Sequence, residues 1–225
     1  MGGRGTRRVE VSPERLSGWL DGFAARHGQV SWDAASEQVT LTAEDGARAV
    51  CAVPFPPLDV DPDTPFGGLV RHACAERRVG VLLVRLGGHA VGVFEGTRLV
   101  ASKVGSRHVQ GRSAAGGWSQ QRFARRRAHQ ATQAYAATTD VAVRILVPQA
   151  SALDAVVTGG DRRAVAAVLA DPRLAVLGPR VSGRLLDVPD PRRKILDGTP
   201  RLFRAVTVAI TDPTEPSTIQ ASSSG

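Results

Sequence analysis

Two adjacent glycines, Gly116 and Gly117, stand before a segment rich in glutamine and arginine. Glycine permits positive φ angles and lets a ligand approach the backbone without meeting a Cβ atom. A helix that starts after such a loop offers its first N–H groups to an anion or to a developing oxyanion. Gln120 and Gln121 can donate and accept hydrogen bonds, and neither titrates. They could orient a water molecule but are poor general bases, so the segment predicts a site that acts by placement.

The other residue types that carry chemistry form no comparable group. His108, His129 and Ser119 are close in sequence, but no acidic residue lies in this interval to orient a histidine. The five histidines show no metal-ligand spacing, and Cys51 and Cys74 form no Cys-x-x-Cys pair. We therefore expect no metal and no cofactor. The two cysteines are interpreted as small buried hydrophobic residues, with a disulfide as the alternative.

The positive charge of the chain is concentrated in one segment. The net charge is +8, yet no acidic residue lies between Glu95 and Asp140. The cations of this interval are Arg98, Lys103, Arg107, Arg112, Arg122, Arg125, Arg126 and Arg127. A solvated protein surface usually mixes both signs, whereas a segment of one sign is typical of a protein that binds a polyanion. We predict RNA contacts for Arg107, Arg112, Arg122, Arg125, Arg126 and Arg127, with an anionic lipid surface or solubility as alternatives. Trp118 is interpreted either as a residue that stacks on RNA bases or as one that folds back onto the core.

The first 78 residues predict a small α+β unit. Ser12-Pro13-Glu14 is a typical helix start, and a helix is expected to run from there to Gly28. Residues 38–42 and 48–53 predict a hairpin of two strands. The remaining elements expected here are a proline-rich connector over 54–65 and a second helix over 67–78.

From residue 79 the pattern changes to a mixed α/β sheet. Strands expected at 81–84, 90–94 and 98–104 form a meander, followed by a basic glycine-rich segment over 105–118 and a helix over 119–137. The later elements expected are strands at 141–147, 154–158, 175–177 and 202–210, and a helix at 162–169 capped by Asp161. We predict domains over 1–78 and 79–212 and a disordered tail over 213–225.

The segment Gly116-Gly117-x-Ser119-x-x-Arg122-Phe123-Ala124-Arg125 resembles the Gly-Gly-Gln loop and following helix of eukaryotic and archaeal class I peptide chain release factors. The resemblance covers roughly residues 79–212 and also includes the meander and the position of Val157-Thr-Gly-Gly160 ahead of a helix. It implies an RNase H-like α/β fold for this domain. Without the attached helix, the glycine pair would be interpreted as an ordinary flexible loop.

The chain departs from the family pattern at one position. Trp118 stands where the family has its glutamine, and the glutamines follow at Gln120 and Gln121. This displacement resembles the divergent release-factor-like peptidyl-tRNA hydrolases of ribosome-associated quality control, in a bacterial form. The resemblance implies Gln120 first, Gln121 second and Gln110 third as the catalytic glutamine. Residues 1–78 do not resemble a codon-reading domain, so rescue of stalled ribosomes is expected rather than termination at stop codons.

The resemblance implies a reaction at the ribosome. The loop would enter the peptidyl-transferase centre of the large subunit and position a water molecule against the ester of peptidyl-tRNA. The alternatives are an endonuclease that cuts tRNA near its 3′ CCA end and a non-catalytic ribosome- or RNA-binding module. No apolar run is long enough to span a membrane, and the first residues lack the apolar region of a signal peptide. We therefore expect a cytoplasmic protein. We also expect a monomer, because a ligand of the ribosomal A site must fit a narrow cavity.

Overall fold

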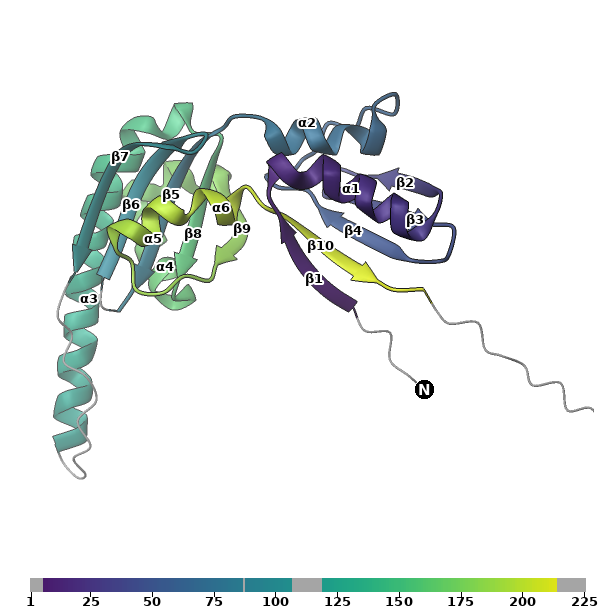
Figure 1. The fold of residues 1–225 in the computed structure, drawn as a ribbon. Helices are drawn as coiled ribbons and strands as arrows, with labels where there is room; N and C mark the ends of the chain where they lie inside the picture. The colour runs from purple at the N-terminus through teal and green to yellow at the C-terminus, as the bar shows by residue number, and fades with distance from the viewer. Residues whose placement is uncertain (1–5, 87, 107–118, 214–225) are drawn as a thin grey trace, which may run out of the picture. The chain divides into compact units, whose positions relative to one another are not determined.

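The computed structural model describes residues 6–86, 88–106 and 119–213, and of residues 106 and 119–129 it describes the backbone alone. The chain divides into two compact units (Figure 1). The first is formed by Met1–Cys74 together with Arg204–Gly225, and the second by Ala75–Phe203. Within the described ranges no helix is both long enough and apolar enough to cross a membrane.

The first unit is an antiparallel sheet with helices packed against one face. The strand order is β1-β10-β4-β3-β2. The strands are β1 (Thr6–Val11), β2 (Val30–Ala34), β3 (Gln38–Ala43), β4 (Arg48–Ala52) and β10 (Val206–Thr211). The helices are α1 (Pro13–His27) and α2 (Leu69–Cys74), with a 3-10 turn at Pro65–Gly68 before α2. The predicted helix and hairpin of this unit are confirmed.

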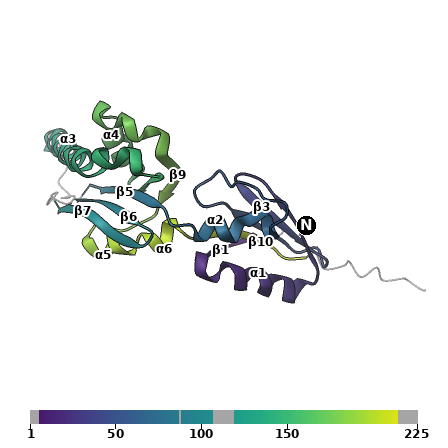
Figure 2. The same ribbon diagram turned by 90° about the horizontal axis from the view of Figure 1, so that it is seen from above.

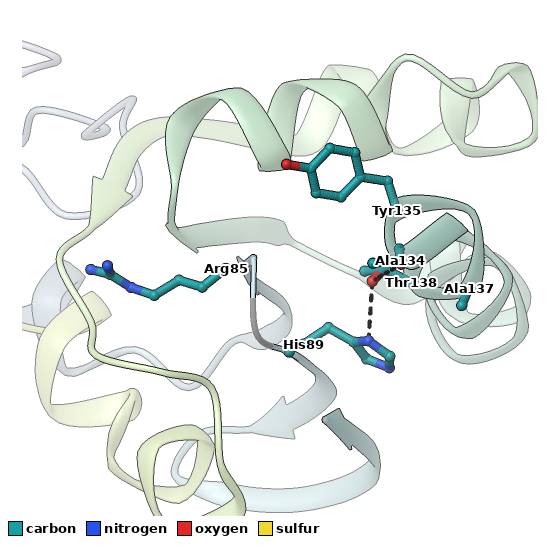
Figure 3. Close-up of a pocket in the computed structure, with 7 residues that line it drawn as sticks. Arg85, His89, Ala134, Tyr135, Ala137 and Thr138 are labelled. Atoms are coloured by element: carbon teal, nitrogen blue, oxygen red, sulfur yellow. Dashed lines mark hydrogen bonds between the residues drawn. The ribbon is translucent and has the colours of Figure 1, made fainter. Parts of the chain in front are cut away.

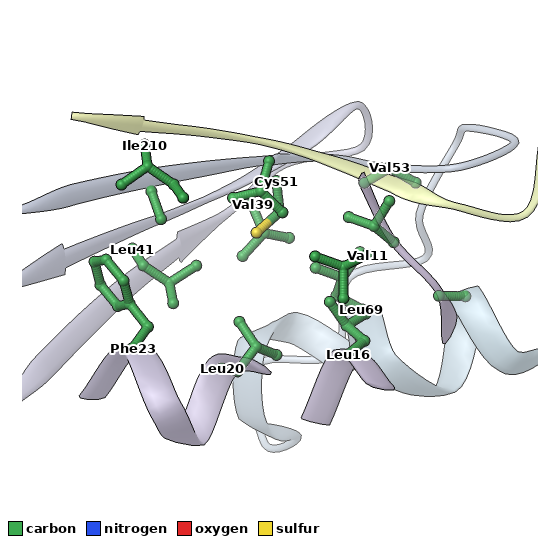
Figure 4. Close-up of a cluster of buried hydrophobic side chains, with 14 of the residues drawn as sticks. Val11, Leu16, Leu20, Phe23, Val39, Leu41, Cys51, Val53, Leu69 and Ile210 are labelled. Carbon is green, nitrogen blue, oxygen red and sulfur yellow. The ribbon is translucent and has the colours of Figure 1, made fainter. Parts of the chain in front are cut away.

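The start and the buried face of α1 follow from its sequence. Ser12 has an extended backbone, Pro13 opens the first turn, and Gly28 ends the helix with a φ of 85°. Leu16, Leu20 and Phe23 recur at helical spacing and are fully or almost fully buried. They pack on alternating strand residues from β3, β4 and β10, as Figure 4 shows.

The second unit is a mixed sheet covered by helices on both faces (Figure 2). The strand order is β7-β6-β5-β8-β9, antiparallel from β7 to β5 and parallel from β5 to β9. The strands are β5 (Arg78–Arg85), β6 (Gly88–Glu95), β7 (Arg98–Ser106), β8 (Ala155–Gly160) and β9 (Val181–Leu186). On one face lie α3 (Ser119–Leu146) and α4 (Arg162–Leu169), and on the other lie α5 (Arg193–Gly198) and α6 (Pro200–Phe203). The 3-10 segments are Val147–Ala152 and Pro172–Arg180. The predicted fold class, a mixed α/β domain with a small α+β unit before it, is confirmed.

Three predicted elements of this chain are wrong. Residues 141–147 are not a strand, because α3 continues through Leu146 and buries Val141 and Ala142 on its inner face. A short apolar run does not distinguish a strand from a buried helical turn. Residues 175–177 lie in a 3-10 segment, and the predicted helix over 67–78 is confined to Leu69–Cys74. That helix starts late because Phe66, Gly67 and Gly68 all have positive φ angles.

Other elements have no counterpart in the expected pattern. Strands β1, β2 and β9 and the helix α5 were not predicted. Asp161 caps α4 as expected, since its carboxylate accepts a hydrogen bond of 2.8 Å from the Ala164 N–H.

The two units differ from the predicted division at 78/79. The last strand, β10, pairs with β1 and β4 and places Val206, Val208 and Ile210 in the core of the first unit. The second unit ends at Phe203, so the predicted range 79–212 includes a strand of the first unit. The N-terminal boundary lies at Cys74, before the predicted one. The tail predicted over 213–225 lies almost entirely outside the described residues.

Candidate functional site

The predicted site residues fall into two groups. Gly116, Gly117, Trp118, Arg107 and Arg112 lie outside the described residues, as does Gln110. The helix predicted to follow the loop begins at Ser119, as expected. Gln120 and Gln121 lie in its first turn, and the next turns carry Arg122, Arg125, Arg126 and Arg127. The structure gives the backbone of these helical positions, and their roles remain predictions.

The helix that carries these residues, α3, is much longer than predicted. It has 28 residues, which corresponds to about 42 Å at 1.5 Å per residue. Among the side chains described in α3, burial begins at Thr138 and continues with Thr139, Val141, Ala142 and Leu146. Figure 1 shows the N-terminal half of α3 extending past the ends of β6 and β7. The first turn of α3 therefore stands well away from the body of its unit.

The C-terminal part of α3 is held by the core of the second unit. Val141, Ala142 and Leu146 belong to one buried cluster with Val91 and Val93 of β6. On the outer side, the Arg173 guanidinium lies 3.0 Å from Asp140 Oδ1 and 3.0 Å from Asp171 Oδ2. These ion pairs are exposed, so the apolar cluster supplies most of the attachment.

A polar contact between Thr138 and His89 joins α3 to the sheet (Figure 3). His89 Nδ1 of β6 lies 3.0 Å from Thr138 Oγ1. The Thr138 hydroxyl donates its hydrogen to the Ala134 carbonyl at 2.8 Å, so it must accept from His89. The proton of the neutral imidazole is thereby assigned to Nδ1. Nε2 is left as a buried acceptor without a hydrogen-bond partner in the described part of the chain.

A cavity of about 210 Å³ lies beside this contact. Its lining is mostly apolar and is formed by Arg85, Gly88, His89, Ala134, Tyr135, Ala137 and Thr138. The Arg85 side chain points away from His89 (Figure 3), and its Nε donates to the Val188 carbonyl at 2.7 Å. Burial and the nearby Asp161 raise the pKa of Tyr135. No cluster of possible metal ligands occurs in the ranges that the structure covers.

Comparison with known proteins gives the chain its family. A family model described as acVLRF1, Actinobacteria/chloroflexi VLRF1 release factor, matches residues 77–209, more than half of the chain. The chain belongs to this release-factor family. The matched range starts two residues into the second unit and runs into β10. No curated protein matches the chain.

Solved structures similar to this chain are distant in sequence. One, described as an archaeal protein, is 16% identical with a TM-score of 0.36. The match covers 69% of this chain and 47% of that one. The archaeal translation termination factor aRF1 is 14% identical with a TM-score of 0.41, over 88% of this chain and 66% of that one. This chain thus spans about half of the length of the first structure and about two thirds of the length of the second.

The contact that supports α3 was not predicted from the sequence. His89 was one of five histidines without ligand spacing, and Thr138 had no assigned role. The pairing depends on the register of β6 and on the continuation of α3 beyond residue 137. Both are tertiary features, so no local sequence signal could have identified the pair.

The burial of His89 predicts that stability depends on pH. Burial first, and then the charge of Lys103, lower the pKa of His89 below its usual value of 6.5. The unfolded chain therefore takes up the proton before the folded one does, so stability is retained above pH 6.5 and decreases as the pH falls below it. We expect a His89→Asn variant, which cannot titrate, to lose less stability between pH 7 and pH 5. Urea unfolding at both pH values tests this. Equal losses of stability in the wild-type protein and in the His89→Asn variant would contradict this prediction.

Proposed function

We propose that this protein rescues stalled ribosomes by hydrolysing the ester bond of peptidyl-tRNA in the peptidyl-transferase centre of the large subunit. The segment from Gly116 to Gln121 positions the attacking water, with Gln120 or Gln121 as the residue that orients it. Ribosomal RNA and the terminal ribose of the tRNA supply the rest of the site. As a translation factor without a cofactor, it would act in the cytoplasm as a monomer.

One observation carries the proposal: the glutamines occupy the first turn of the 28-residue helix α3, and among the described side chains of that helix Thr138 is the first that is buried. A catalytic group at the tip of a projecting helix suits a site at the end of a narrow channel in a much larger partner. The membership in a release-factor family supports the same reading. Uncharged glutamine suits a reaction in which the protein contributes placement, and placement alone can lower a barrier by roughly 7–11 kcal/mol.

The proposal is tested by single-turnover incubation with ribosomes that carry labelled peptidyl-tRNA, followed by analysis of both the peptide and the tRNA 3′ end. Free peptide with an intact CCA end is the expected result. A peptide still attached to a tRNA fragment would indicate the nuclease, and no reaction would indicate a non-catalytic RNA-binding protein. Ribosomes with a stop codon or a sense codon in the A site should react equally, since rescue does not read the codon.

The arginines of α3 are expected to set ribosome affinity. Replacing Arg125, Arg126 and Arg127 by glutamine should weaken binding by about 10- to 100-fold at moderate salt and flatten the salt dependence, because fewer counterions are released from phosphates. Binding of labelled protein to ribosomes over a salt series measures both effects.

The matched control removes the same charge elsewhere. Arg7, Arg8 and Arg48 are exposed residues of the first unit, and their triple glutamine variant has the same net charge. Equal losses in the two triple variants would mean that net charge, and not the α3 arginines, governs binding.

A further inference from the structure

His89 touches both chain segments between which residues 107–118 lie. In the pairing of β6 with β7, His89 stands opposite Gly105, the residue before the end of β7. A Cβ atom at Gly105 would lie 2.5 Å from His89 Cε1 and 2.6 Å from Nε2. The imidazole ring therefore lies directly against the β7 backbone, in space that only glycine leaves free. On its other side the ring donates to Thr138 of α3.

Thr138 is placed where a small movement is amplified. It is the first buried side chain of α3 among those described, about 28 Å along the helix axis from Ser119. A tilt of about 4° at this point would move the first turn by about 2 Å on that length. The apolar residues that follow Thr138 hold the helix on the sheet, but a hydrogen bond fixes direction in a way that apolar packing does not.

We propose that His89 is a positioning residue that fixes the direction of α3 relative to the end of β7, and thereby the place of Gln120 and Gln121. The proposal rests on the proposed function for its activity readout, and on geometry alone for its structural readout. A misplacement of about 1 Å can cost about 100-fold in rate, so even a partial loss of direction is measurable.

Two pairs of variants separate the hydrogen bond from the bulk of the side chains. Thr138→Val keeps the shape and removes the hydroxyl, whereas Thr138→Ser keeps the hydroxyl. His89→Leu removes the donor, whereas His89→Asn places an amide N–H near the position of Nδ1. Gly105→Ala displaces the ring without changing either partner of the bond.

The variants that remove the contact are expected to lower the rate of catalysis and to leave ribosome binding unchanged. Thr138→Val, His89→Leu and Gly105→Ala should lower the release rate at saturating protein about tenfold or more, with the half-saturating concentration unchanged. Thr138→Ser and His89→Asn should release at close to the wild-type rate. The double variant His89→Leu/Thr138→Val should be no slower than either single variant, since both remove one contact.

The direction of α3 can also be measured without ribosomes. Spin labels at Ser119→Cys and Ala167→Cys, the latter exposed on α4, report the distance from the helix start to the body in a Cys74→Ser background. Burial raises the pKa of Cys51 to about 12, so its thiol should stay unlabelled. The distance distribution should broaden in Thr138→Val and stay narrow in Thr138→Ser.

The two readouts distinguish failure of this proposal from failure of the proposed function. If the wild-type protein releases no peptide, the proposed function fails, and the spin-label distances still decide whether His89 sets the direction of α3. An unchanged distance distribution in Thr138→Val, or an unchanged release rate in that variant when the wild type is active, overturns the proposal.

Discussion

Replacing Gln120 and Gln121 together by alanine is expected to lower the rate of peptide release by about 100- to 1,000-fold, the usual loss when a group that positions or stabilises the reacting atoms is removed. Both residues lie in the first turn of α3, and alanine is the best helix former, so the helix should persist. The measurement is the single-turnover rate on stalled ribosomes, together with the circular dichroism of each variant.

The single variants tell which glutamine acts. If one single variant lowers the release rate nearly as much as the double variant does, the role belongs to that residue, and we expect it to be Gln120. Gln133→Ala is the matched control, since it makes the same change in an exposed side chain of the same helix. Full activity in both single variants and in the double variant would reject the glutamine mechanism, provided that the wild-type protein releases peptide.

Truncating Leu146 to alanine is expected to destabilise the second unit by about 2–5 kcal/mol, the range observed for buried leucines. Leu146 is 0% exposed and belongs to the cluster that holds α3 on the sheet. Its Cδ2 atom lies 3.2 Å from the place where a Cβ atom at Gly80 would stand, so the side chain fills the space above a glycine of β5. Its removal leaves a void that backbone on the β5 side cannot easily fill.

Leu86→Ala supplies the control for that prediction. Leu86 is 46% exposed, so the same truncation there should change stability by no more than about 0.5 kcal/mol. Urea unfolding gives the size of the change, and hydrogen exchange of the β5 and β8 amides reports which unit it affects. Similar midpoints for the two variants would show that Leu146 contributes no more than a surface residue.

Local signals in the sequence predicted the elements that are fixed locally. The start of α1 could be predicted from Ser12 and Pro13, and that of α4 from Asp161, because capping residues act within one turn. The β5–β7 meander could be predicted because short turns separate its strands. A helix over 119–137 was also predicted, and α3 covers Ser119–Leu146 of the described residues.

The elements that depend on distant partners could not be predicted. Apolar residues around Val141 suit a strand as well as a buried helical turn, and only their packing on β6 decides. β10 alternates like any strand, and nothing local indicates that its partners are β1 and β4. For the candidate site, the glutamines and arginines were identified by residue type and spacing. The His89–Thr138 contact required the tertiary structure.

The placement of β10 has a consequence for how this protein is itself synthesised. Thr6 of β1 and Thr211 of β10 are partners separated by 205 positions, with the whole second unit between them. During translation the sheet of the first unit cannot be completed until the last residues of β10 leave the exit tunnel. Until then β1 and β4 lack the strand that lies between them. The second unit can fold earlier, as soon as Phe203 has emerged. The first unit of such a chain is completed only after β10 has been synthesised, so a nascent chain that stalls before β10 would expose unpaired strand edges.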